Sequence, residues 1–254
     1  MSEDAGSART STAQRKTYSR FSTTIRRWFR ANGRDLPWRR TRDPYQVLVS
    51  ELMLQQTQVS RVVPKYAEFL ETFPTLGDVA RARPKRVMEA WDGLGYYARA
   101  RNLRALARVV TDGGRDDDAA LPADTAALRA LPGVGAYTAG AVSSFAYERR
   151  EALVDTNVAR VVRRVFAPHV NSKSARGQKE IWTIARAILP RTGKATWTHN
   201  QAIMELGALI CTARVAHCHA CPVRALCASR KTMSAARSAP THLLPNRVLP
   251  GRRD

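Results

Sequence analysis

Acidic residues are scarce in this sequence, and long apolar runs are absent. Its 254 residues include 21 Asp and Glu against 42 Lys and Arg, which gives a formal net charge of +21 and a sequence pI near 11.0. No apolar run reaches the roughly 18 residues that a membrane helix needs. The N-terminal MSEDAGSARTST also lacks the basic and apolar stretches of a secretory signal. We therefore interpret the chain as a soluble intracellular protein.

The excess of positive charge lies mostly in the body of the chain. A net charge of +2 on residues 1–20 and of +5 on residues 228–254 leaves +14 for residues 21–227. So basic a body favours a polyanionic partner, and nucleic acid is the first to consider. The alternative is an arginine-rich composition imposed by a GC-rich genome, which would give the same excess without such a partner.

The hydrophobic pattern has a helical period, and strand-like alternation is nearly absent. Residues 1–18 are rich in Ser, Thr and Ala without a period, so we expect them to be disordered. Asp43 and Pro44 have the order of an N-cap residue followed by a proline at the start of a helix. We expect an all-α protein with helices over residues 21–31, 44–56, 60–73, 84–92, 97–112, 124–130, 137–148, 157–166, 177–189 and 198–211.

Cysteine occurs only in one short stretch, as a C-x6-C-x2-C-x5-C pattern of Cys211, Cys218, Cys221 and Cys227. Clustered cysteines in an intracellular chain bind metal more often than they form disulfides. Zinc sites of four cysteines usually pair two short C-x2-C knuckles, whereas the longer gaps here suit a wider body. We therefore favour a 4Fe-4S cluster, with zinc as the alternative.

The segment LPGVG at residues 131–135 has two glycines where a tight turn between helices needs unusual backbone angles. A helix on each side would make a helix-hairpin-helix. The backbone N–H groups of Gly133, Val134 and Gly135 would then be available to a DNA phosphate. An ordinary turn between two helices explains these residues equally well.

Two carboxylates are candidates for acid–base chemistry. Glu51 lies on a helix whose apolar residues point in nearly every direction, and burial raises the pKa of a carboxyl toward that of a general acid. Pairing with one of the many arginines is the commoner arrangement for such a residue. Asp155 directly precedes an amphipathic helix, and its alternative role is that of an N-cap.

Six segments carry a family resemblance: DLPWR (35–39), SELMLQQTQV (50–59), GLGYYARARNL (93–103), LPGVGAYTAGA (131–141), VDTNV (154–158) and NQAIMELGALIC (200–211). Together they resemble the helix-hairpin-helix DNA glycosylase superfamily, and within it the A/G-specific adenine DNA glycosylases. Endonuclease III would have a lysine at the position of Tyr137. The mismatch-specific thymine glycosylases tolerate tyrosine there but lack the LQQTQ and GLGYY segments.

The resemblance implies two helical domains with DNA bent across the cleft between them. A six-helix barrel with the hairpin is expected over residues 41–148, and a 4Fe-4S cluster domain over residues 19–40 plus 149–227. Residues 1–18 are expected to be a basic disordered segment, and residues 228–254 a basic disordered tail. The expected partner is double-stranded DNA with a mispaired adenine, and the protein is expected to be a monomer.

The resemblance also implies residue roles. Glu51 would protonate the departing adenine and then position the attacking water, while Asp155 would stabilise the sugar cation. The flipped base and the DNA around it would contact Arg34, Leu36, Trp38, Arg39, Gln55, Gln56, Thr57, Leu94, Tyr96 and Gln201. Tyr96 is the expected wedge, and Gln56 and Thr57 are expected to contact the opposite purine.

We thus expect a base excision repair enzyme of the bacterial cytoplasm, associated with the nucleoid when it acts on DNA. It would remove adenine opposite 8-oxoguanine or guanine. Because Tyr137 stands where a Schiff-base lysine would be, we expect the enzyme to be monofunctional. Adenine glycosylases commonly have a C-terminal Nudix-like domain for 8-oxoguanine, and the 27 residues after Cys227 are too few for one. Alternatives are a mismatch-specific thymine or uracil glycosylase on the same scaffold and a non-catalytic DNA-binding module.

Overall fold

The computed structural model describes residues 11–116, 119–230 and 232, and within these residues it contains helices but no β-strand. The all-α prediction is therefore confirmed. The α-helices are α1 (Thr12–Asn32), α2 (Pro44–Leu54), α3 (Val59–Thr72), α4 (Leu76–Arg81), α5 (Pro84–Ala90), α6 (Ala98–Val110), α7 (Thr125–Arg129), α8 (Ala136–Phe145), α9 (Thr156–Phe166), α10 (Ala175–Ala187) and α11 (Gly193–Leu209). No helix among the described residues is long and apolar enough to cross a membrane.

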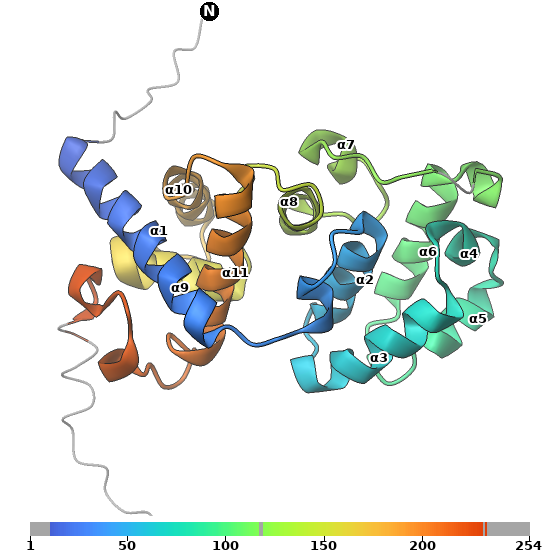
Figure 1. The fold of residues 1–254 in the computed structure, drawn as a ribbon, viewed down its shortest axis with the longest axis horizontal. Coiled ribbons are helices and arrows are strands. Elements are labelled where there is room, and N and C mark those ends of the chain that lie inside the picture. Colours follow the sequence, from blue (N-terminus) through green and yellow to red (C-terminus); the bar gives the residue numbers. More distant parts are fainter. Residues whose placement is uncertain (1–10, 117–118, 231, 233–254) are drawn as a thin grey trace, which may run out of the picture.

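The helices gather in two groups, with α1, α9, α10 and α11 in one and α2 to α6 in the other (Figure 1). In the first group α11 packs against both α1 and α9. In the second group α6 packs against α2, α4 and α5. Helix α8 contacts both α2 and α11, so it joins the groups. One hydrophobic core runs through all of these helices.

Helix α1 begins earlier than predicted, and the prediction that residues 12–18 are disordered is wrong. Its N-cap is Ser11, whose hydroxyl accepts a hydrogen bond from the backbone N–H of Gln14 at 3.2 Å. Tyr18, Phe21 and Ile25 lie buried on one face. The turns before Tyr18 are exposed and carry no apolar period, so the sequence pattern missed them. Residues 1–10 lie outside the described residues.

The predicted C-terminal tail also starts too early. The backbone N–H groups of Ala228 and Ser229 donate to the carbonyls of Val165 (3.0 Å) and Arg164 (3.1 Å) at the end of α9. These two residues are therefore fixed to the folded part of the chain. Most of the predicted tail, residues 231 and 233–254, lies outside the described residues.

Helix α2 is surrounded by other helices, and this placement determines the environment of Glu51. Asp43 caps its first turn by accepting from the backbone N–H groups of Tyr45 (2.8 Å) and Gln46 (3.2 Å), with Pro44 as the first helical residue. From Val47 to Met53 every residue is buried, so the polar side chains of Ser50 and Glu51 are almost fully shielded from solvent. The predicted burial of this helix is confirmed.

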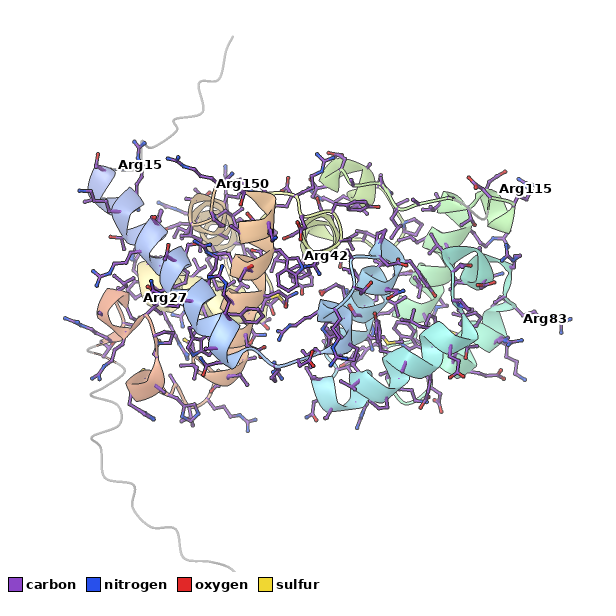
Figure 2. The ribbon with its side chains drawn as sticks, in the orientation of Figure 1. Arg15, Arg27, Arg42, Arg83, Arg115 and Arg150 are labelled. Carbon is purple, nitrogen blue, oxygen red and sulfur yellow. The ribbon has the colours of Figure 1, made fainter. Side chains whose placement is uncertain are left out.

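Arginine side chains extend from the surface of both groups of helices (Figure 2). Arg42, near the centre of the view, links the segment before α2 to α11: its guanidinium carbon lies 4.3 Å from the centroid of the Trp197 ring. It also pairs with Glu148 at 3.2 Å. Contacts of this kind involve individual arginines. They do not offset the net charge of +21, so the protein is strongly basic.

Candidate active site

A cleft of about 760 Å³ is formed by the residues before and within α2, the hairpin before α8, the start of α9 and one face of α11. Most of the predicted site residues line it: Arg34, Leu36, Trp38, Arg39, Glu51, Gln55, Gln56, Thr57, Gly133, Gly135, Tyr137, Asp155 and Gln201. Leu94 and Tyr96 line an adjoining hollow, which shares Gln56 and Thr57 with the cleft. Val134, within the hairpin, is buried and lines neither. Segments far apart in the sequence therefore meet at one site.

Glu51 is the buried acid of the cleft, with only 3% of its surface exposed. Burial raises the pKa of this carboxyl to about 7, and the nearby charge of Asp155 acts in the same direction. The hydroxyl of Tyr137 donates a hydrogen bond of 2.6 Å to Oε2 of Glu51 and lowers the pKa, as does the charge of Arg39. A substantial fraction of Glu51 is therefore protonated at neutral pH, as a general acid requires.

Tyr137 is the partner of Glu51, where the sequence favoured an arginine. It lies on the first turn of α8, and the contact between α8 and α2 brings its hydroxyl to the carboxyl. Burial raises the pKa of Tyr137, so the phenol keeps its proton and acts as a hydrogen-bond donor. A neutral phenol can orient the carboxyl without supplying a nucleophilic amine.

Asp155 is both the N-cap of α9 and a wall residue of the cleft. Its Oδ1 accepts from the backbone N–H of Val158 at 2.6 Å, and its Oδ2 accepts from Nδ2 of Asn157 at 3.0 Å. Burial raises the pKa of Asp155, and these hydrogen bonds act in the opposite direction. The N-cap interpretation from the sequence is confirmed, and it fixes the carboxylate at the edge of the cleft.

Glu205 organises the opposite wall and was not among the predicted residues. Its side chain is 1% exposed and binds Arg34 at 2.8 Å and Arg39 at 2.9 Å. Burial by itself would raise the pKa of Glu205, but the hydrogen bonds from these two arginines lower it to about 2. Arg39 also donates from Nε to Oε1 of Gln201 at 2.8 Å. Glu205 thus holds two cations and, through Arg39, an amide in place.

A signal for Glu205 was present in the sequence. It follows Gln201 by one helical turn, in the otherwise apolar stretch AIMELGALIC. An acid at a spacing of four from an expected pocket residue lies on the same helix face. Together with the arginines of the DLPWR region, that position could have been predicted as a buried ion pair.

The hairpin has the backbone that its glycines predict. Gly133 has a φ of +74°, and a Cβ at this position would come within 2.5 Å of the Cβ of Asn102. Gly135 is the N-cap of α8, and this helix has no side-chain cap. Its first backbone N–H groups therefore keep their donor capacity for another acceptor.

The four cysteines line one common hollow between α9, the end of α11 and the segment that follows it. None of the four forms a disulfide. Burial raises the pKa of Cys221 to about 11, and the proximity of the other three cysteines acts in the same direction. Nη1 of Arg164 lies 3.4 Å from Sγ of Cys211. Among the described residues, no three His, Cys, Asp or Glu side chains are grouped tightly enough to hold a single metal ion.

Comparison with known proteins places this geometry in a family. A sequence model described as "HhH-GPD superfamily base excision DNA repair protein" matches residues 49–187. The adenine DNA glycosylase of Homo sapiens is 40% identical over 222 residues, which cover 83% of this chain and 39% of that protein. The adenine DNA glycosylase of Mycolicibacterium smegmatis is 43% identical over 197 residues, which cover 77% of this chain and 65% of that protein. The chain thus spans between about two fifths and two thirds of the length of these relatives.

The three-dimensional structure is similar to proteins of the same kind. The solved structure of a thermostable thymine-DNA glycosylase superposes with a TM-score of 0.77 at 31% identity, covering 87% of this chain and 99% of that one. The family match extends over more than half of the sequence and contains the second half of α2 with Glu51, the hairpin and the start of α9. The chain therefore belongs to the HhH-GPD superfamily of base excision DNA repair proteins.

Proposed function

We propose that the protein is a monofunctional DNA glycosylase that hydrolyses the N-glycosidic bond of adenine mispaired with guanine or 8-oxoguanine in double-stranded DNA. The observation that carries this proposal is the pair of carboxyl groups in the cleft. Glu51 has a pKa raised to about 7. Burial also raises the pKa of Asp155, but hydrogen bonds from Val158 and Asn157 oppose this rise and favour its anionic form. Cleavage of a glycosidic bond needs one proton donor and one anionic stabiliser.

The reaction follows from these two environments. Glu51 donates its proton to the adenine as the bond between the sugar carbon and the base nitrogen breaks, and the bonding electron pair leaves with the base. The carboxylate of Asp155 stabilises the positive charge that develops on the sugar. A water molecule then adds to the sugar carbon, and its proton returns to Glu51. Tyr137 orients Glu51 through their 2.6 Å hydrogen bond and offers no amine for a Schiff base.

The walls of the cleft support a site for a flipped base. They combine an aromatic ring, two arginines and an amide, which suit a planar heterocycle with several hydrogen-bonding atoms. These wall residues are Trp38, Arg34, Arg39 and Gln201. Tyr96 is 61% exposed, as expected of a side chain that wedges between bases. We propose that the N–H groups of Gly133 and Gly135 contact a DNA phosphate, whereas the N–H of Val134 donates to the carbonyl of Leu131 at 3.2 Å within the turn. We also propose that the enzyme acts as a monomer.

We further propose that Cys211, Cys218, Cys221 and Cys227 hold a 4Fe-4S cluster. The common hollow that the four cysteines line supports a site with four thiolate ligands, since none of them forms a disulfide. When bound, the cluster would supply a rigid crosslink for the segment after α11. The proposed excision reaction does not involve the cluster. With the corrected ends, the proposed domains are residues 12–40 plus 149–229 around the cysteines and the barrel of residues 41–148. Iron and zinc analysis of the purified protein separates the cluster from the alternative metal.

A thymine or uracil mismatch glycosylase is the second candidate. The observation in its favour is that the chain covers 99% of a thymine-DNA glycosylase, at 31% identity. The adenine-specific relatives are more similar, at 40% and 43% identity, but they are longer than this chain. The greater similarity favours adenine as the substrate.

Single-turnover assays test the proposal. The duplexes carry adenine opposite guanine, 8-oxoguanine or thymine, and thymine or uracil opposite guanine; strand breaks are scored with and without alkali. We expect adenine release from the guanine and 8-oxoguanine duplexes, with breaks that depend on alkali. Release of thymine or uracil alone would support the second candidate, and breaks without alkali would contradict the monofunctional mechanism. Glu51→Gln is the control for contaminating glycosylases.

A further inference from the structure

Arg99, on the first turn of α6, is buried where neither the proposed chemistry nor the base pocket requires it. It is 7% exposed, and it has no carboxylate partner among the described residues. Its guanidinium instead donates to Leu52 O (2.7 Å), Met53 O (2.9 Å), Gln55 O (2.6 Å), Thr57 Oγ1 (3.2 Å), Leu94 O (3.1 Å), Gly95 O (3.0 Å) and Tyr96 O (3.4 Å). Carbonyl dipoles thus compensate for the burial of this charge.

These acceptors belong to two separate segments. One is the end of α2 with residues 55–57, directly after Glu51, and the other is the loop of residues 94–96 before α6. The two segments are also joined directly by a long hydrogen bond, in which the hydroxyl of Thr57 donates to the carbonyl of Leu94 at 3.4 Å. One guanidinium therefore holds together two segments that lie about forty positions apart in the sequence.

Each segment contains a non-glycine residue in the left-handed region. Gln56 has a φ of +58° and Tyr96 a φ of +47°. Such residues remain in this unfavourable conformation only where their surroundings fix them. Arg99 binds the carbonyls of Gln55 and Gly95, which directly precede the two residues, as well as the carbonyl of Tyr96 itself. The guanidinium is placed to hold both conformations.

The same guanidinium also lies over the faces of two aromatic rings. Its central carbon is 5.7 Å from the ring centroid of Trp91, which is fully buried, and 5.5 Å from that of Tyr96, which is mostly exposed. Cation–π attraction therefore favours one orientation of the exposed ring, anchored on the buried one.

We propose that Arg99 is a positioning residue that locks residues 55–57 and 94–96 into one rigid unit, so that Tyr96 enters the base stack while Gln56 and Thr57 meet the opposite strand. This inference rests on the proposed glycosylase function and deepens it. It assigns Arg99 to extraction of the base from the duplex and not to cleavage of the glycosidic bond. Loss of the lock should then slow excision only where the base must first be unstacked.

The test compares two substrates in single-turnover excision. One duplex has adenine paired opposite guanine, and the other has adenine in a one-nucleotide bulge, where it is already unpaired. The variants are Arg99→Lys, which keeps the charge, and Arg99→Gln, which keeps some hydrogen bonding. Arg104→Gln is the matched control, because Arg104 lies on the same helix and donates to a backbone carbonyl, that of Ala82 at 2.8 Å, away from the cleft.

We expect Arg99→Gln to slow excision of the paired adenine by about 100-fold, since unstacking is the costly step that a wedge supports. Excision of the bulged adenine should change by less than about fivefold, with an unaltered pH profile, because Glu51 remains in place. Arg99→Lys should lie between the wild type and Arg99→Gln, and Arg104→Gln should match the wild type on both duplexes.

An equal loss on both duplexes by the folded Arg99→Lys protein would overturn the inference, as would an unchanged rate on the paired duplex. If Arg99→Gln does not fold, Arg99→Lys alone tests the inference: its loss of rate must be larger on the paired duplex than on the bulged one. Failure of the wild type to release adenine from either duplex would instead refute the proposed function.

Discussion

Replacing Glu51 with glutamine is expected to abolish base excision and, at the same time, to stabilise the folded protein. The amide has nearly the shape of the carboxyl and can still accept the hydrogen bond from Tyr137. It cannot donate a proton as an acid, so excision stops. It also never ionises, so the cost of a buried charge disappears.

The structure gives the sign and the size of the stability change. Because the pKa of Glu51 in the folded protein lies above its ordinary value, the folded state binds more protons than the unfolded state between the two values. Ionisation of Glu51 therefore destabilises the wild type increasingly as the pH rises from 4.5 to about 7. The difference between those two pKa values corresponds to about 3 kcal/mol above pH 7. Below pH 4.5 the two proteins should be nearly equal in stability.

Urea unfolding followed by circular dichroism, from pH 4 to pH 8.5, measures this difference. Glu205→Gln is the matched control, because Glu205 is also buried but its pKa is lowered to about 2 by Arg34 and Arg39. Its contribution is present above pH 4.5 and is lost as the pH falls toward 2, so this variant should be less stable than the wild type above pH 4.5. If Glu51→Gln gains no stability at pH 8, Glu51 is not a costly buried carboxyl, and the argument for a general acid fails.

Further predictions concern the other groups of the site. Asp155→Asn should slow excision by about 100-fold or more while mismatch affinity, measured by fluorescence anisotropy, stays within a few-fold, since the anion acts on developing charge; equal losses of rate and affinity would contradict this role. Tyr137→Phe removes a hydrogen bond that lowers the pKa of Glu51, so the alkaline limb of the pH–rate profile, expected near pH 7 in the wild type, should move to higher pH. A move to lower pH would refute that relation. Cys218→Ser should lose bound iron and DNA affinity, and an unchanged iron content would rule out the proposed cluster.

The burial of Glu51 could be predicted from its own helix, whereas its partner could not. Apolar residues on every side of α2 require that the helix be enclosed, whatever the rest of the fold. Which side chain meets the carboxyl depends on how α8 packs against α2, and Tyr137 is 86 positions away. An abundance of arginines made arginine the expected partner, but packing decided otherwise.

The same distinction explains the other differences between sequence and structure. The N-cap of Asp155 is a local feature and was predicted. Arg99 acts through contacts with distant segments, so no local pattern distinguishes it from an ordinary polar residue. The spacing of Glu205 from Gln201 was a local signal, but its arginine partners are set by distant segments. Helix α4, of six residues, was missed because it is too short to display a hydrophobic period, although its Thr75–Asp78 capping box is a recognisable local signal.

The most direct test of the account is to identify the base that the enzyme releases. An excess of enzyme is incubated with a duplex that contains one adenine–guanine mismatch, and the free bases are analysed by mass spectrometry, with Glu51→Gln treated in parallel. The account predicts free adenine from the wild type only, with the strand intact until alkali is added. Release of a pyrimidine, an equal yield of adenine from Glu51→Gln, or no free base from the folded, metal-loaded wild type would contradict it.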